Sequence, residues 1–125
     1  MVFSSWFFNS QFTPKNNFDT YKNQVEITKS NIDFGNSSCG ETVTIIGNIK
    51  NNSAIDWKSL NFEVVYYDKE NNITDTEQIE KFSFTLPANK EVPFKLSMKK
   101  EFGDAQYVGY ETRVISAREK VLFFE

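Results

Sequence analysis

The densest group of side chains that could do chemistry is a run of five carboxylates. They are Asp68, Glu70, Asp75, Glu77 and Glu80. Converging carboxylate oxygens bind calcium, and a pair of carboxylates can hydrolyse a glycoside. This run lacks the spacing and the glycine of an EF-hand loop, and no two members stand out as an acid–base pair. We therefore interpret it as a solvated hairpin face and predict no metal site and no catalytic residue.

The chain contains no histidine and a single cysteine, Cys39. The absence of histidine excludes Ser–His–Asp and Cys–His catalysis as well as HExxH zinc sites. Cys39 lies in a glycine- and serine-rich turn, where nothing activates a thiolate. Since a glycine-rich phosphate loop is also missing, we expect a protein that is not an enzyme and holds no cofactor. A hydrolase that uses carboxylates alone is the minor alternative.

The charge of the chain argues against nucleic acid as a partner. The 125 residues carry 14 basic and 17 acidic side chains, for a net charge of −3. The basic residues are scattered, and the pair Lys99-Lys100 is followed at once by Glu101. No stripe of positive charge could neutralise a row of phosphates.

Aromatic residues, which make up 16% of the chain, are the remaining functional candidates. Tyrosine and tryptophan are enriched at protein interfaces because they combine a large apolar ring with a polar group. Trp57 is interpreted as a core residue of the fold. The candidate interaction surface consists of Phe3, Trp6, Phe7, Phe8, Tyr107 and Tyr110.

The first residues of the chain are apolar and aromatic, and two interpretations are open. Phe3, Trp6 and Phe7 have helical spacing, which fits a short amphipathic turn that packs on the domain or rests at a membrane interface. Alternatively, residues 2–8 are the end of a longer apolar anchor or signal. No run of 18 apolar residues, long enough to span a membrane, occurs in the sequence. Residues 9–23 are polar and are predicted to form a linker or a loose lead-in, anchored at points by Phe12, Phe18 and Tyr21.

From residue 24 the apolar residues alternate with polar ones, which indicates half-buried strands. The clearest examples are Leu60 to Tyr66 and Val92 to Met98. Gly47 predicts a bulge or a close approach of two backbones, and Pro93 predicts an edge strand. The expected strand segments are 24–28, 42–50, 60–67, 73–86, 92–98, 107–117 and 121–124.

One strand breaks the alternation. Ile79 is out of phase with Phe82, Phe84 and Leu86, which would share one face. This predicts a bulge near Glu80.

About seven strands with short connections leave no room for the helices that parallel strands require. The sequence therefore predicts an all-β fold, an antiparallel two-layer immunoglobulin-like sandwich over residues 24–125, preceded by the extension 1–23. A closed barrel is the second choice.

Several motifs inside these strands resemble the FxLYD domain family, a group of small immunoglobulin-like bacterial and archaeal domains of unknown role. They are Gly47-Asn48-Ile49-Lys50-Asn51-Asn52-Ser53, Val64-Val65-Tyr66-Tyr67-Asp68, Asn71-Asn72, Leu86-Pro87-Ala88 and Phe94. The resemblance covers residues 42–98, with Val64 in place of the phenylalanine and Tyr66 in place of the leucine. It implies an exported or membrane-anchored protein and carries over no catalytic residue.

The matched residues have structural explanations of their own. Asn51 can cap a turn, and Asp68 can open the hairpin turn that ends at Asn72. Tyr67 is expected to bury its ring while its hydroxyl reaches a backbone partner.

Together these observations predict a bacterial, non-enzymatic binding or assembly module in the cell envelope. We expect a protein partner there, and membrane contact through the N-terminal segment. A cytoplasmic location and a self-assembling structural subunit are the alternatives, so the sequence leaves the oligomeric state open.

Overall fold

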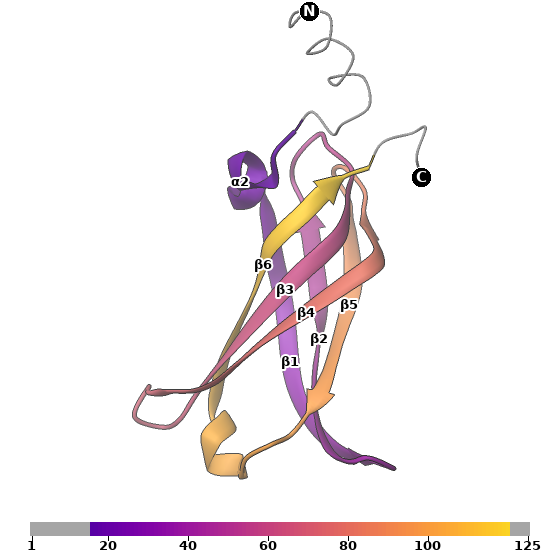
Figure 1. The fold of residues 1–125 in the computed structure, drawn as a ribbon. Coiled ribbons are helices and arrows are strands. Elements are labelled where there is room, and N and C mark those ends of the chain that lie inside the picture. Colours follow the sequence, from indigo (N-terminus) through magenta and orange to yellow (C-terminus); the bar gives the residue numbers. More distant parts are fainter. Residues whose placement is uncertain (1–15, 121–125) are drawn as a thin grey trace, which may run out of the picture.

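Six strands form two antiparallel three-stranded sheets in the computed structural model, which describes residues 16–120 (Figure 1). One sheet has the order β1-β2-β5 and the other β4-β3-β6. The all-β sandwich is therefore confirmed, and the expected segment 121–124 lies outside the described residues. The strands are β1 (Val25–Ser37), β2 (Gly40–Asn51), β3 (Trp57–Tyr67), β4 (Ile73–Leu86), β5 (Glu91–Lys99) and β6 (Gly109–Glu119).

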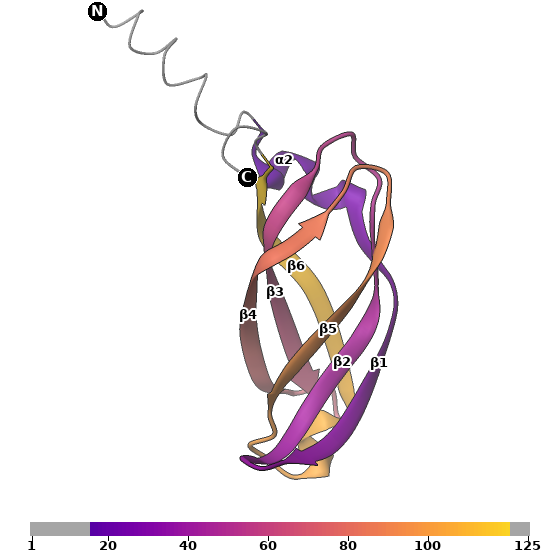
Figure 2. The ribbon, with the colours of Figure 1, turned by 90° about the vertical axis from the view of Figure 1, so that its right-hand side faces the viewer.

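The two sheets face each other across one apolar core (Figure 2). The alternation in β3 has the predicted effect, since Leu60, Phe62, Val64 and Tyr66 are all fully buried. Phe94 of the facing sheet stacks on Phe62, with 5.4 Å between the ring centroids. The period of two in the sequence thus specifies the inner face of the central strand.

Gly47 allows a close approach between β2 and its neighbours. A Cβ atom at this position would lie 2.2 Å from the carbonyl oxygen of Lys29 and 2.9 Å from the ring of Phe94. The register of β1 against β2 shifts between Ile27 and Lys29, so β1 is bulged beside this glycine. The predictions of a close approach at Gly47 and of an edge position for Pro93 in β5 are both confirmed.

The predicted bulge in β4 is also confirmed, two residues beyond Glu80. Thr85 pairs with Lys58 and Lys81 pairs with Leu60, so the three residues 82–84 of β4 lie opposite the single residue Ser59 of β3. This irregularity separates Phe82 from Phe84 and Leu86, with which it was expected to share a face. Phe82 is exposed, whereas Phe84 is half-buried and Leu86 is fully buried.

A single helical turn, α2 (Phe18–Tyr21), precedes the first strand and leads into the 3-10 helix η1 (Lys22–Gln24). The side chain of Asn17 caps α2 by accepting a hydrogen bond from the Asp19 N–H. The rings of Phe18 and Tyr21 lie 5.1 Å and 5.8 Å from that of Trp57. Their predicted anchoring and the core position of Trp57 are confirmed, because Phe18 and Trp57 are both buried.

The expectation for Tyr67 was wrong, since its neighbour takes the buried position. Tyr66 lies on the inner face of β3, and its hydroxyl donates to the sulfur of Met98 at 2.8 Å. Tyr67 lies on the outer face, where its hydroxyl donates to Glu111 Oε1 at 2.9 Å. The alternation of β3 decides this, because Tyr66 continues the apolar row that begins at Leu60.

Asn51 and Ser53 form a buried polar network where the two sheets meet. The Asn51 amide donates to the carbonyl oxygens of Ile55 and Leu86, at 2.7 Å and 3.1 Å. Its Oδ1 accepts from the backbone N–H and the hydroxyl of Ser53, and the Ser53 hydroxyl oxygen accepts from Trp57 Nε1 at 3.2 Å. The side chain of Asn51 therefore joins the end of β2 to the following loop and to β4, and the hydroxyl of Ser53 extends the network to Trp57 of β3.

We predict that Asn51→Ala destabilises the fold by about 3 kcal/mol, because it leaves several buried polar groups without partners. Urea denaturation measures the free energy of unfolding. Asn52→Ala is the matched control, since Asn52 is exposed and its change should stay within about 0.5 kcal/mol. Equal losses in the two variants would contradict a central role for Asn51.

Candidate functional site

The structure describes two residues of the expected interaction surface, Tyr107 and Tyr110. Phe3, Trp6, Phe7 and Phe8 lie outside the described residues. Among residues 16–120, no helix is long and apolar enough to cross a membrane. Tyr107 belongs to the 3-10 helix that precedes β6, and Tyr110 belongs to β6 itself.

Tyr107 was expected in a strand and on the surface, but it is 3% exposed. It belongs to the 3-10 helix η2 (Asp104–Tyr107). The ring of Tyr107 packs against that of Tyr66, with 4.8 Å between the ring centroids. The Tyr107 hydroxyl oxygen accepts the backbone N–H groups of Glu101 and Phe102, at 3.0 Å and 3.2 Å. Tyr107 therefore shapes the loop between β5 and η2 and is not itself available to a partner.

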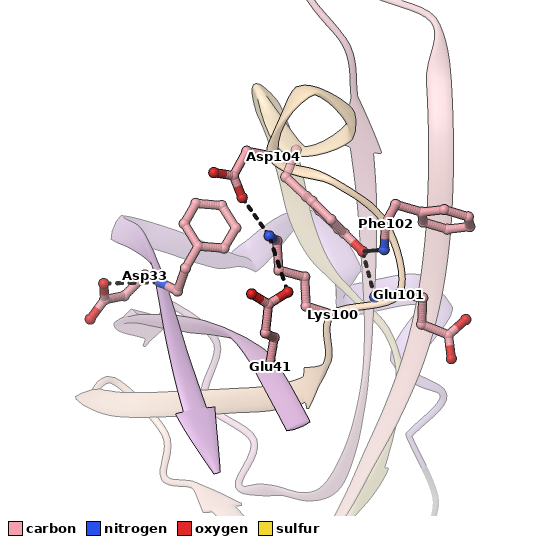
Figure 3. A network of polar contacts seen from close by, with 8 residues as sticks. Asp33, Glu41, Lys100, Glu101, Phe102 and Asp104 are labelled. Carbon is pink, nitrogen blue, oxygen red and sulfur yellow. Dashed lines mark hydrogen bonds and ion pairs between the residues drawn. The ribbon is translucent and has the colours of Figure 1, made fainter. Parts of the chain in front are cut away.

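The same loop is held by Lys100 (Figure 3). Its largely buried side chain pairs with Asp104 and with Glu41, the latter at 3.7 Å, and its Nζ lies 5.4 Å from the centroid of the Phe34 ring. The hydrogen bond to Asp104 raises the pKa of Lys100 above its usual value. Lys100 therefore connects this loop to β2 through Glu41 and to η2 through Asp104.

A cleft of about 380 Å³ lies between β1 and β6. Each of these strands is the outer strand of its sheet and has no second pairing partner within residues 16–120. Four aliphatic side chains line the cleft: Val25, Ile27, Val114 and Ile115. Two open sheet edges thus border one partly apolar cleft.

Thr112 is the unusual residue of this cleft. Its hydroxyl oxygen is buried and has no hydrogen-bond partner among the described residues. Buried polar groups are nearly always paired, since an unpaired one costs about 1–3 kcal/mol. An unpaired hydroxyl in a cleft marks a position where a ligand could donate or accept a hydrogen bond.

Two polar contacts connect β6 to the segments on the other side of the cleft. Toward one end, the hydroxyls of Tyr110 and Ser30 lie 2.9 Å apart and bridge β6 and β1. At the other end, the Asn16 side chain donates to Glu119 at 2.8 Å and holds the start of the described chain against β6. Tyr110, predicted from the sequence as an interaction residue, is not among the residues that line the cleft but lies two residues before Thr112 on β6.

The rim of the cleft is charged. Lys22 and Glu26 line it on one side and Arg113 on the other. Arg113 is also paired with Glu63 on the outer face of β3, where its Nε donates at 2.7 Å. An apolar interior with a mixed polar rim is suited to a short extended segment of another protein.

The carboxylate run does not converge on one point. Asp68 caps its own hairpin turn by accepting the N–H groups of Glu70 and Asn72, both at 2.9 Å. The hydrogen bond from Asn72 lowers the pKa of Asp68. Within residues 16–120, no three Asp, Glu, Cys or His side chains are grouped to hold a metal ion.

Sequence reasoning missed Thr112 as a site residue. The sequence places it correctly on one face of a strand with Tyr110 and Val114. It cannot show that β6 is an outer strand, because this depends on which strands pair.

Glu77 belongs to the same run and lies opposite the inner-facing Val64 in the strand register. Burial first, and then the negative charges of Asp75 and Glu101, raise its pKa above the ordinary value. The folded protein therefore holds this proton more tightly than the unfolded chain does. Stability falls as the pH rises through the folded-state pKa of Glu77.

We predict that Glu77→Gln stabilises the protein by about 0.5 kcal/mol near neutral pH, because it removes a partly buried charge beside like charges. The gain should shrink at about pH 4, where the wild-type carboxyl is protonated in the folded state. Urea denaturation at both pH values measures this difference. The control is Glu70→Gln in the exposed hairpin turn, and a Glu77→Gln gain that does not depend on pH would contradict the prediction.

Comparison with known proteins adds one structural likeness. No family model and no curated protein matches this chain. A solved structure, titled "X-ray structure of Northeast Structural Genomics Consortium target SoR45", is similar over 78% of this chain and 86% of its own, with a TM-score of 0.41 and 13% identity.

Proposed function

We propose that this protein is a non-enzymatic binding module that holds an extended segment of a partner protein at the cleft between β1 and β6. The observation that carries the proposal is the unpaired Thr112 hydroxyl between two open sheet edges. In β-strand addition, backbone pairing supplies affinity and pockets for alternate side chains supply specificity. The cleft offers both kinds of contact.

The edge of β1 is the better of the two for pairing. The part of β1 that lines the cleft, Val25 to Ile27, pairs with β2 in continuous register, and the bulge between Ile27 and Lys29 follows it. The register of β6 against β3 is irregular near the cleft, between Ser116 and Val114. A partner strand would pair with β1 and direct apolar side chains toward Val25 and Ile27, with a polar group at Thr112.

Peptides selected from a random display library test this proposal. We expect the selected peptides to have alternating apolar residues and to bind with micromolar affinity. Their binding should slow amide hydrogen exchange along β1 of the protein. Thr112→Val should weaken binding about tenfold without loss of stability, because the hydroxyl has no partner within the domain.

Thr76→Val is the matched control, since Thr76 is exposed and lies on β4, away from the cleft. Two results would contradict the proposal. In one, the peptides protect β5 or β4 in place of β1. In the other, Thr112→Val binds as tightly as the wild type.

The second part of the proposal concerns location. The resemblance to the FxLYD family and the aromatic residues Phe3, Trp6, Phe7 and Phe8 support a bacterial envelope protein that contacts the membrane through its N-terminus. The hydrogen bond between Asn16 and Glu119 holds the start of the described chain at the end of β6. Membrane contact through residues 1–15 would thus place that end of the sandwich nearest the bilayer.

Liposome flotation tests the membrane contact. We compare the full chain with a version that begins at Asn16, which keeps the packing of Phe18 and Tyr21 on Trp57. We expect only the full chain to float, because apolar and aromatic side chains supply the interfacial affinity. The control is Trp6→Ser/Phe7→Ser in the full chain, which should float less. Equal behaviour of the full and shortened chains would refute the membrane contact.

A further inference from the structure

The outer face of the β4-β3-β6 sheet has a second hollow, separate from the cleft between β1 and β6. Its volume is about 200 Å³, smaller than ordinary drug-sized ligand pockets. Its polar and aromatic lining residues are Ser59, Asn61, Glu80, Phe82, Ser116 and Arg118. The three strands each contribute side chains to it.

A distortion of the central strand underlies the hollow. Ser59 has a φ of 53°, a left-handed conformation that is costly for a residue other than glycine. The registers of β3 against β4 and against β6 both shift next to this residue. The Ser59 hydroxyl donates to the Phe82 carbonyl oxygen at 2.9 Å and holds the bulged segment of β4 in place. Strain of this kind is often kept where a site requires it.

The hollow contains an unsatisfied acceptor. Asn61 Oδ1 is buried and, within residues 16–120, has no hydrogen-bond partner. A carbonyl oxygen in this condition needs a donor from outside the domain. The ligand must therefore present an O–H or N–H group.

Phe82 supplies an apolar surface at the same place. It is 75% exposed, the largest exposed fraction among the exposed large hydrophobic residues that the structure describes. The bulge in β4 turns it away from the core side that Leu86 occupies. An exposed ring that lines a hollow favours a ligand with an apolar face.

The charges at the hollow are balanced. Glu80 contributes one negative charge and Arg118 one positive charge. A cationic side chain would be opposed by Arg118 and an anion by Glu80. Both groups can instead hydrogen-bond neutral hydroxyls, as acceptor and as donor.

From this combination we propose that the hollow binds one neutral sugar ring of a saccharide. The ring's C–H face would lie on Phe82, one hydroxyl would donate to Asn61 Oδ1, and others would contact Glu80 and Arg118. This site is independent of the peptide cleft, so either proposal can fail without the other.

NMR titration of the uniformly ¹⁵N-labelled full chain tests the proposal. The probes are glucose, galactose, mannose, N-acetylglucosamine and the β-linked trimers of glucose and N-acetylglucosamine. We expect saturable shifts at the Asn61 side-chain amide and at the backbone amides of Ser59 and Phe82, with a Kd of about 1–10 mM for at least one probe. Phe82→Ala should weaken that binding at least about tenfold.

Two further variants make the result specific. Phe102→Ala is the matched control, because Phe102 is an exposed phenylalanine on the loop between β5 and η2. Asn61→Leu should remain folded, with an unchanged or higher Tm, yet lose saccharide binding, since it removes the unsatisfied acceptor.

Three outcomes would overturn the saccharide site. They are no saturable shift at the hollow with any probe, equal effects of Phe82→Ala and Phe102→Ala, and shifts produced by a lysine-rich peptide but by none of the sugars. Peptides that bind the β1–β6 cleft should bind Phe82→Ala as they bind the wild type.

Discussion

The buried amide of Asn51 is the contact on which the joining of the two sheets depends. Its four hydrogen bonds satisfy backbone groups of Ser53, Ile55 and Leu86 and the hydroxyl of Ser53. That hydroxyl in turn accepts the Trp57 indole N–H. A fully satisfied polar network in a core orients its members uniquely, because any other arrangement leaves polar groups unpaired. The position of Trp57, on which Phe18 and Tyr21 pack, is therefore set by a polar interaction as well as by apolar burial.

Two sheets of three strands leave four outer edges, and the sequence treats them differently. β5 carries Pro93, which cannot donate a ladder hydrogen bond. On β4, Asp75 and Glu77 pair in register with Tyr66 and Val64, which face inward on β3. Charged residues at such positions of an outer strand disfavour its pairing with the edge of another sheet. β1 has a bulge at its start, but its register is then continuous from Lys29. The segment of β1 that lines the cleft, Val25 to Ile27, lies before this bulge and keeps a continuous register with β2.

Much of the fold could be predicted from residue patterns. The rows from Leu60 to Tyr66 and from Val92 to Met98 locate the inner faces, and Gly47 and Pro93 locate a close approach and an edge. Tyr67 and Tyr107 were placed wrongly for physical reasons. Tyr66 and Tyr67 are neighbours of the same type, so only the alternation of the strand decides which of them points inward. The burial of Tyr107 depends on η2 and on the loop N–H groups that donate to its hydroxyl, which come together only in the folded chain.

The two candidate sites lie where local patterns and the folded structure diverge. Simple alternation would place Phe82 on the same face of β4 as Phe84 and Leu86. The bulge instead leaves its side chain exposed beside Asn61. Thr112 follows its strand pattern, yet its hydroxyl is buried with no hydrogen-bond partner among residues 16–120, in the cleft beside the outer strand β1. Each arrangement has a cost in stability that the core does not require, since an apolar residue would avoid the unpaired oxygen. Elsewhere in this domain the residue patterns agree with the folded structure. The positions of Phe82 and Thr112 depart from that agreement, and such positions are where binding sites are expected.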